Sequence, residues 1–407
     1  MTTFVAEWLL PIVQRPLRRG SLTVRDGRIQ AVTTEPPPEA IDLGRVALLP
    51  ALVNAHTHLE LSFLHERVPP APRFGPWVQT LMAIRRQYPD PADPRILEAA
   101  RAAITRARET GTGLFGDISN TLVTTPILRD MGVPAHVFHE LTGFTEPDPR
   151  ARVHEARQRA DAAASADVRV SVAPHAPYSV SAALFGAIRE DVDAHASARS
   201  SVHLGENEEE VELLRDGTGT IRKVLEDLGR WPADWRPPGC SPVEYLRDLG
   251  FLDRRTLAVH GVQFTGEDLA TLRDLQVTLV ACPRSNVHVG VGSPPLEAFY
   301  AMDVEVALGT DSLASVPDLD MFAELAEARR IAPRVPARRL LESATLTGAH
   351  ALGFEDDFGS LEAGKRSEVL VVRVPEGVAD VEEYLVSGVT PDAIAWLNPD
   401  EGGVPFQ

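Results

Sequence analysis

The chain has 407 residues, of which 44% are hydrophobic and 24% charged, with a formal net charge of −18 and two cysteines. This charge argues against a nucleic-acid partner. The sequence has no uninterrupted run of about 18 apolar residues, so we expect no membrane span. The basic residues of the N-terminus follow its apolar run, the reverse of a secretion signal, and two cysteines make no disulfide framework, so we expect a cytoplasmic protein.

The two ends of the chain both contain short strand patterns. Residues 1–45 include SLTVRDGRIQAV, two runs joined by Asp-Gly, which is typical of a β-hairpin. Near the other end, GSLEAGKRSEVLVVRV again predicts a turn and a strand. We expect residues 1–45 and 359–407 to form one small β domain; two unrelated tails are the alternative.

From residue 46 to 358, apolar strand candidates alternate with helical stretches. Runs such as VRVSVAP are almost continuously apolar, as in parallel strands that are buried on both faces. Eight strand–helix units predict an α/β fold, a (β/α)8 TIM barrel. The predicted strands are 46–56, 113–119, 134–140, 168–174, 200–205, 256–261, 277–283 and 304–310, and a helix is expected over 91–111.

Residues 207–255 are too long for one crossover helix and form an insertion within the barrel. Loops of this length are usually functional or disordered. Because the segment contains Trp231, Trp235 and Tyr245, we predict a packed lid over a ligand site, with disorder as the alternative.

Polar residues gather where the predicted strands end, which is the edge that carries barrel active sites. His56, His58 and Glu60 would share one face of the first strand. Each residue has a structural alternative; His260 could satisfy a buried carbonyl and Asp311 could cap a helix. Their joint occurrence at one rim predicts a metal site. The other polar residues at the ends of the predicted strands are His175 after strand four, His203 and Glu206 at strand five, His260 at strand six and Asp311 at strand eight.

Three imidazoles and one carboxylate are the ligands that suit Zn2+, with Fe2+ as the alternative, whereas Ca2+ and Mg2+ prefer oxygen ligands. The predicted ligands of a single divalent metal are His56, His58, His203 and Asp311. This set leaves one position for water, whose pKa a bound Zn2+ lowers toward about 7.

The segments PALVNAHTHLELS, PHAPYSVS, VHLGE, GTDS, ATLTGAHALG and GSLEAGKRSEVLVV resemble the amidohydrolase superfamily over nearly the whole chain. The resemblance implies a barrel flanked by a small β sandwich from both termini. One departure, Ser367-Glu368-Val369 where the family commonly has Ala-Asp-Leu, lies in that appendage. Strand four offers no Lys or Glu to bridge two metals, which indicates the mononuclear branch of aminohydrolases and triazine chlorohydrolases.

In that branch, the resemblance assigns three residues to catalysis. Asp311 would take a proton from metal-bound water, and His260 would orient the resulting hydroxide. Glu206 would protonate a ring nitrogen beside the attacked carbon, and ammonia would leave. Such positioned acids and bases contribute about 10²–10⁴-fold each.

HTHLELSF with PHAPYSVS looks most like the aminodeoxyfutalosine deaminases of menaquinone biosynthesis. The expected substrate is therefore a small adenine-bearing nucleoside, most closely 6-aminodeoxyfutalosine. The alternatives are S-adenosylhomocysteine or methylthioadenosine, another heterocycle for an amino- or chlorohydrolase, and, more remotely, an inactive scaffold.

Two residues are expected to contact that substrate. Glu60 would bind ribose hydroxyls, unless it is a solvated loop carboxylate, and His175 would contact the substrate. A substrate carboxylate would need an arginine, for which the candidates are Arg73, Arg85, Arg86 and Arg284. The oligomeric state is left open, a homo-oligomer included.

Overall fold

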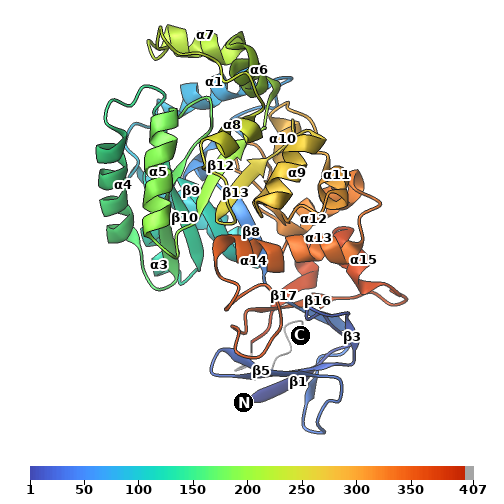
Figure 1. The fold of residues 1–407 in the computed structure, drawn as a ribbon. Coiled ribbons are helices and arrows are strands. Elements are labelled where there is room, and N and C mark those ends of the chain that lie inside the picture. The colour runs from blue at the N-terminus through green and yellow to red at the C-terminus, as the bar shows by residue number, and fades with distance from the viewer. Residues whose placement is uncertain (399–407) are drawn as a thin grey trace.

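The computed structural model describes residues 1–398, in which a barrel of eight parallel strands stands on a smaller β unit (Figure 1). Consecutive strands pair in parallel within two four-stranded sheets. A bridge between Thr57 and Asp311 joins the last strand to the first, so the predicted (β/α)8 barrel is confirmed. Its strands are β8 (Leu52–Thr57), β9 (Thr112–Ser119), β10 (Ala135–Leu141), β11 (Val168–Pro174), β12 (Ser200–Leu204), β13 (Thr256–His260), β14 (Thr278–Ala281) and β15 (Val306–Leu308).

Helices surround the barrel and bury the outer faces of its strands. The expected helix over 91–111 is α2 (Pro94–Glu109), which begins where Asp93 accepts a hydrogen bond from the Arg95 amide and Pro94 occupies the first turn. None of the helices within residues 1–398 is long and apolar enough to cross a membrane. The others around the barrel are α3 (Thr124–Asp130), α4 (Pro149–Ala163), α5 (Ala182–Ala194), α9 (Gly266–Asp274), α10 (Pro283–His288), α11 (Leu296–Ala301), α12 (Met321–Ile331), α13 (Ala337–Ser343), α14 (Leu346–Leu352) and α15 (Val381–Val386).

The smaller unit contains strands from both ends of the chain, which lie together at the bottom of Figure 1. One sheet has the order β5-β4-β1-β6 and the other β17-β16-β7-β2-β3. Buried residues of the two sheets, such as Phe4, Leu22 and Val371, share one core, so the expected β sandwich is confirmed. Its strands are β1 (Thr2–Val5), β2 (Trp8–Leu9), β3 (Leu17–Arg18), β4 (Ser21–Arg25), β5 (Arg28–Thr33), β6 (Ile41–Asp42), β7 (Val46–Pro50), β16 (Val369–Arg373) and β17 (Ile394–Trp396).

The predicted hairpin is the β4–β5 pair, and Gly27 adopts the positive φ of +71° that its turn needs. The division of the chain at residues 45 and 359 remains a prediction. Residues 399–407 of the predicted terminal domain lie outside the described residues.

The predicted strand 46–56 is two strands in the structure, and this expectation was wrong. Val46–Pro50 (β7) pairs antiparallel with β16 in the terminal sheet, whereas Leu52–Thr57 (β8) pairs with β9 in the barrel. Every residue from 46 to 57 is buried. Because both sheets bury this segment on both faces, its apolar pattern does not show where the chain leaves one sheet for the other.

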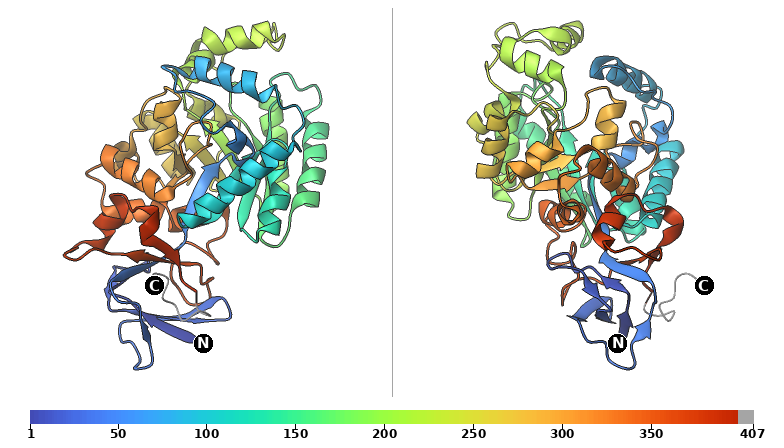
Figure 2. Two further views of the ribbon diagram at one scale, coloured as in Figure 1. Left: turned by 180° about the vertical axis from the view of Figure 1, so that it is seen from behind. Right: turned by 90° about the vertical axis from the view of Figure 1, so that its right-hand side faces the viewer.

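The insertion 207–255 is ordered and carries α6 (Glu208–Asp216), α7 (Gly219–Asp227) and α8 (Pro242–Asp248). Helices α6 and α7 lie at the top of the molecule, near α1 (Phe74–Arg85) (Figures 1 and 2). Trp231 and Trp235 pack against each other and against Phe144 of the loop after β10, with ring centroids 4.9 to 6.1 Å apart. The segment is thus packed onto the barrel, and its role as a lid stays a prediction.

Candidate functional site

Three imidazoles meet at the end of the barrel: His56 in β8, His58 directly after β8, and His203 in β12. Ligand nitrogens of His56, His58 and His203 lie within 4.8 Å of one another. The Nε2 atoms of His58 and His203 are 3.3 Å apart. Two nitrogens bound to one tetrahedral Zn2+ at about 2.0–2.1 Å are about 3.3–3.4 Å apart. The spacing therefore suits two ligands of one metal ion.

The protonation of these imidazoles also suits a metal ligand. The Nδ1 atom of His203 lies 3.1 Å from the carbonyl oxygen of His175, which can only accept a hydrogen bond, so Nδ1 carries the proton and Nε2 keeps its lone pair. Neither ring nitrogen of the buried His56 has a hydrogen-bond partner. Burial lowers the pKa of all three, to about 4 for His203, so they are neutral at pH 7.

Asp311 completes the predicted ligand set. Its Oδ1 lies 3.5 Å from Nε2 of His58 and 3.9 Å from Nε2 of His56. Oδ2 accepts a hydrogen bond of 2.6 Å from Ser285, and burial raises the pKa of Asp311 to about 6. The last strand packs tightly here, because a Cβ on Gly309 would lie 2.8 Å from the main chain of His56.

Glu206 and His260 lie beside the candidate metal-binding cluster of His56, His58, His203 and Asp311. Oε1 of Glu206 is 3.7 Å from Nε2 of His260, and burial raises the pKa of the Glu206 carboxyl well above its usual value. The side-chain amide of Asn286 donates to Nδ1 of His260 at 3.0 Å. His260 and Asp311 have φ values of +81° and +62°, and such strained backbone is concentrated at functional sites.

Three residues of this region were not expected from the sequence. Ser285 and Asn286 belong to CPRSN after β14 and orient Asp311 and His260. Glu140 is the next-to-last residue of β10, and its Oε1 lies 3.4 Å from Nδ1 of His203. The available signal was their position at strand ends, the same signal that identified the histidines.

His175 lies next to the cluster, with its ring centroid 4.9 Å from that of His203. Its Nδ1 is 2.6 Å from the Ser179 hydroxyl, and burial lowers its pKa to about 4. Contact with the substrate remains a prediction for this residue.

Glu60 follows β8 in the short helix η1 (Leu59–Leu64) and is 5% exposed. Five donors occupy its carboxylate: the hydroxyls of Ser119 and Thr121, the amides of Asn120 and Thr121, and Arg85. A carboxylate has about four lone-pair sites. A ribose hydroxyl would have to displace one of these donors, so ribose binding by Glu60 remains a prediction.

Among the four candidate arginines, Arg85 donates to Glu60 at 3.1 Å and to Asn120 at 3.0 Å. Its charge is one of the causes that lower the pKa values of His58 and His175. Arg284 instead forms ion pairs with Asp318 at 2.8 Å and Glu324 at 3.7 Å. The other two, Arg73 and Arg86, flank the ends of α1.

Comparison with known proteins gives the family. The model of the Amidohydrolase family matches residues 47–390. The 5-methylthioadenosine/S-adenosylhomocysteine deaminase of Teredinibacter turnerae is 28% identical over 90% of this chain and 83% of that protein. The aminodeoxyfutalosine deaminase of Deinococcus radiodurans is 29% identical over 83% and 81%. A solved adenosine deaminase from Xanthomonas campestris with bound zinc superposes with a TM-score of 0.80 at 25% identity, over 97% and 90%. The chain is therefore an enzyme of the amidohydrolase family.

Proposed function

We propose that this enzyme is a zinc-dependent deaminase of adenine-bearing nucleosides. The observation that carries the proposal is the convergence of His56, His203 and Asp311, which are buried, and His58, which is partly buried, beside the carboxyl of Glu206. The relatives in Teredinibacter and Deinococcus are named as deaminases of methylthioadenosine, S-adenosylhomocysteine and aminodeoxyfutalosine, all of which bear adenine.

The donor set fits a zinc ion. Neutral imidazoles and one carboxylate are zinc ligands, the nitrogen spacing agrees with tetrahedral coordination, and the Xanthomonas relative binds zinc. Fe2+ is the alternative for the same ligands. When bound, Zn2+ would supply a water whose pKa is lowered to about 7.

The protein side chains would then move two protons. Asp311, held by Ser285, accepts one proton from the attacking water and returns it to the departing amino group. Glu206, whose pKa burial raises well above its usual value, donates a proton to the ring nitrogen next to the attacked carbon. The hydroxyl of the tetrahedral adduct reprotonates Glu206, so the products are the oxo heterocycle and ammonia. His260 lies 3.7 Å from Glu206 and would orient the attacking oxygen.

We propose 6-aminodeoxyfutalosine as the substrate, which would place the enzyme in menaquinone biosynthesis. The Deinococcus relative supports this choice, and so does Arg85, which offers a cation for the substrate carboxylate at the edge of the site. The second candidate is deamination of methylthioadenosine or S-adenosylhomocysteine, which is favoured by relatives of that name at 28 to 30% identity.

The test is to incubate zinc-loaded protein with aminodeoxyfutalosine, S-adenosylhomocysteine, methylthioadenosine, adenosine and guanine. Ammonia release and the ultraviolet shift of the purine report turnover. We expect the highest kcat/KM with aminodeoxyfutalosine. If the protein turns over none of the adenine nucleosides, the proposed deaminase function is refuted. Metal content well below one equivalent, with no activity on adding Zn2+, would favour the inactive scaffold.

A further inference from the structure

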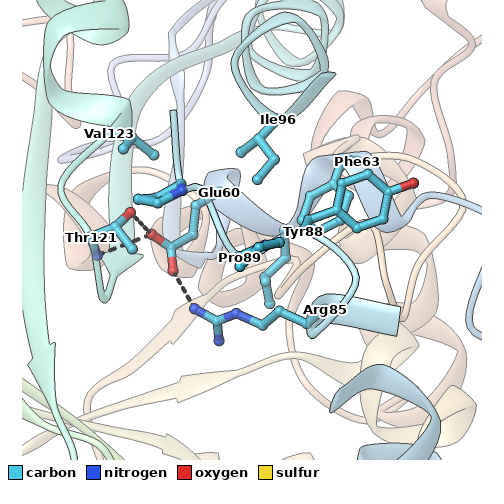
Figure 3. A pocket seen from close by; sticks show the side chains of 10 residues that line it. Glu60, Phe63, Arg85, Tyr88, Pro89, Ile96, Thr121 and Val123 are labelled. Atoms are coloured by element: carbon cyan, nitrogen blue, oxygen red, sulfur yellow. Dashed lines mark hydrogen bonds and ion pairs between the residues drawn. The ribbon is translucent and has the colours of Figure 1, made fainter. Parts of the chain in front are cut away.

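Glu210 is a fully buried carboxyl in the first turn of α6, four residues beyond Glu206. Its Oε2 accepts a hydrogen bond, but its Oε1 has no partner in the described part of the chain. In the pocket of Figure 3, by contrast, the buried carboxylate of Glu60 is directed toward Thr121 and Arg85, and five donors satisfy it. A buried polar atom without a partner costs free energy, so Glu210 calls for an explanation other than stability.

The partner of Glu210 is the main chain at Glu206. Oε2 of Glu210 accepts a hydrogen bond of 3.2 Å from the amide of Glu206, and the amide of Gly205 also bonds to this carboxyl. On the other side of the same peptide unit, the carbonyl oxygen of Gly205 accepts from the amide of Gln263 at 2.8 Å. Both polar atoms of the peptide that precedes the Glu206 side chain are therefore held, one by the loop after β13 and one by Glu210.

A glutamate at the start of a helix often has only a local role. In a capping box, the third residue of the helix accepts a hydrogen bond from the amide of the N-cap residue. The N-cap of α6 is Asn207, whose side-chain oxygen already accepts from the Glu210 amide at 2.9 Å. The Glu210 carboxyl instead bonds to the amide of Glu206, the residue before the N-cap. This contact thus fixes the chain that carries Glu206 rather than the start of the helix.

The turn between β12 and Glu206 depends on such contacts. Gly205 has a φ of +61°, and a Cβ at this position would lie 2.4 Å from the ring of Phe264. Glycine fits here, but it leaves the backbone more freedom than any other residue, so neighbouring groups must fix the residue that follows. The Glu206 carboxyl lies 3.7 Å from Nε2 of His260, and a displacement of about 1 Å at a reacting group can cost about 100-fold in rate.

We propose that Glu210 is a positioning residue, which holds the main chain of Glu206 so that its carboxyl faces the ring nitrogen of the substrate. This inference rests on the proposed function, in which Glu206 is the proton donor. Burial raises the pKa of Glu210 to about 8, so its carboxyl is mostly protonated at pH 7. In that form it presents a carbonyl oxygen to the Glu206 amide and a hydroxyl at Oε1, and a glutamine side chain has nearly the same shape and the same charge.

The test compares three substitutions of Glu210 with the adenine nucleoside that the wild type turns over fastest. Glu210→Met removes the acceptor, and Glu210→Asp keeps a carboxyl but withdraws it by one methylene. Both should lower kcat about tenfold, the effect of one hydrogen bond, with KM and zinc content within about twofold of the wild type. Glu210→Gln keeps the acceptor and should retain kcat within about threefold. The matched control is Glu208→Met, at an exposed position of the same turn, which should retain the wild-type kcat.

A double variant separates the positioning of Glu206 from a general structural role. If Glu210 acts through the Glu206 carboxyl, Glu210→Met should change kcat by less than about twofold in the Glu206→Gln background, where no proton donor is left to position. If Glu210→Met does not fold, Glu210→Asp is used in both backgrounds. Unchanged kcat in Glu210→Met, an equal loss in Glu210→Gln, or the same loss with and without the Glu206 carboxyl would overturn the assignment.

The proposed function and this inference can fail separately. If the wild type deaminates but Glu206→Gln retains full turnover, this inference falls while the deaminase function stands. If the wild type turns over no nucleoside, the deaminase function falls, and hydrogen exchange of the Glu206 amide in zinc-loaded protein still tests the hold on the main chain. Faster exchange in Glu210→Met than in the wild type and Glu210→Gln would support that hold, and equal exchange in all three would overturn it.

Discussion

The buried carboxyl of Asp117 in β9 makes stability depend on pH in a way that one substitution should abolish. Its Oδ1 accepts from the Leu59 amide at 2.9 Å, and its Oδ2 accepts from the Thr124 hydroxyl at 2.6 Å. Asp117 thereby fixes the residue that follows His58. Burial outweighs these hydrogen bonds and raises the pKa of Asp117 from 3.8 to about 7.

The sign follows from proton binding. Between pH 4 and 7 the folded state holds a proton on Asp117 that the unfolded chain does not, so this stabilisation is complete below pH 4 and is lost as the pH rises through 7. A shift of about three units at 1.36 kcal/mol each corresponds to about 4 kcal/mol. About 3 kcal/mol of this falls between pH 4.5 and 8, where unfolding by urea is practical.

Asp117→Asn removes the titration and keeps an oxygen for Leu59 and an amide for Thr124. The free energy of unfolding of the wild type should fall relative to that of the variant as the pH rises. We expect the difference, variant minus wild type, to increase by about 3 kcal/mol from pH 4.5 to 8. Histidine titration is common to both proteins and cancels in the difference. Asp130→Asn, which removes an exposed carboxylate, should follow the wild type. Parallel pH profiles for Asp117→Asn and the wild type would refute the reasoning.

Three further predictions concern the site and its cover. Glu206→Gln should keep the metal and lower kcat by about 10²–10⁴-fold, whereas His203→Ala should lose both the metal and the activity. Metal analysis and kinetics measure the two effects. Wild-type turnover in Glu206→Gln would contradict the proton-donor role. Ser285→Ala removes the shorter of two hydrogen bonds to Oδ2 of Asp311 and should lower kcat about tenfold at full metal occupancy. An unchanged kcat would show that Ser285 does not orient Asp311. Trp235→Ala removes the contact with Phe144 and should speed proteolysis within 228–241 with little change in Tm; equal cleavage rates would count against packing by this ring.

Much of the fold was predictable because buried parallel strands have a clear apolar pattern. The histidines stood out for the same reason, since a polar side chain that ends such a strand must meet a partner. Sequence could not show the break at Ala51, because the terminal sheet and the barrel bury their strands equally.

The strand-end position of the supporting residues was visible in the sequence, but their partners could not be predicted, because these contacts depend on how the loops fold back. Nothing in CPRSN shows that Ser285 reaches Asp311 across 26 positions. Glu140 stands beside other polar residues in its strand, and only the barrel's closure brings it to His203. The five donors around Glu60 come mainly from the loop after β9, about 60 residues away.

The junction of β7 and β8 also bears on how the protein is made. β7, which leads directly into the strand of His56 and His58, is paired with β16 at residues 369–373, and the main chain of His56 is bonded to that of Asp311. Both partners leave the ribosome long after the histidines do. If His56, His58, His203 and Asp311 bind the metal as proposed, the nascent chain lacks Asp311 until about three quarters of it has been translated. The β16 strand, which pairs with β7, is made later still. We therefore expect the proposed metal site to be completed only in the final stage of synthesis, when the two ends of the polypeptide first meet.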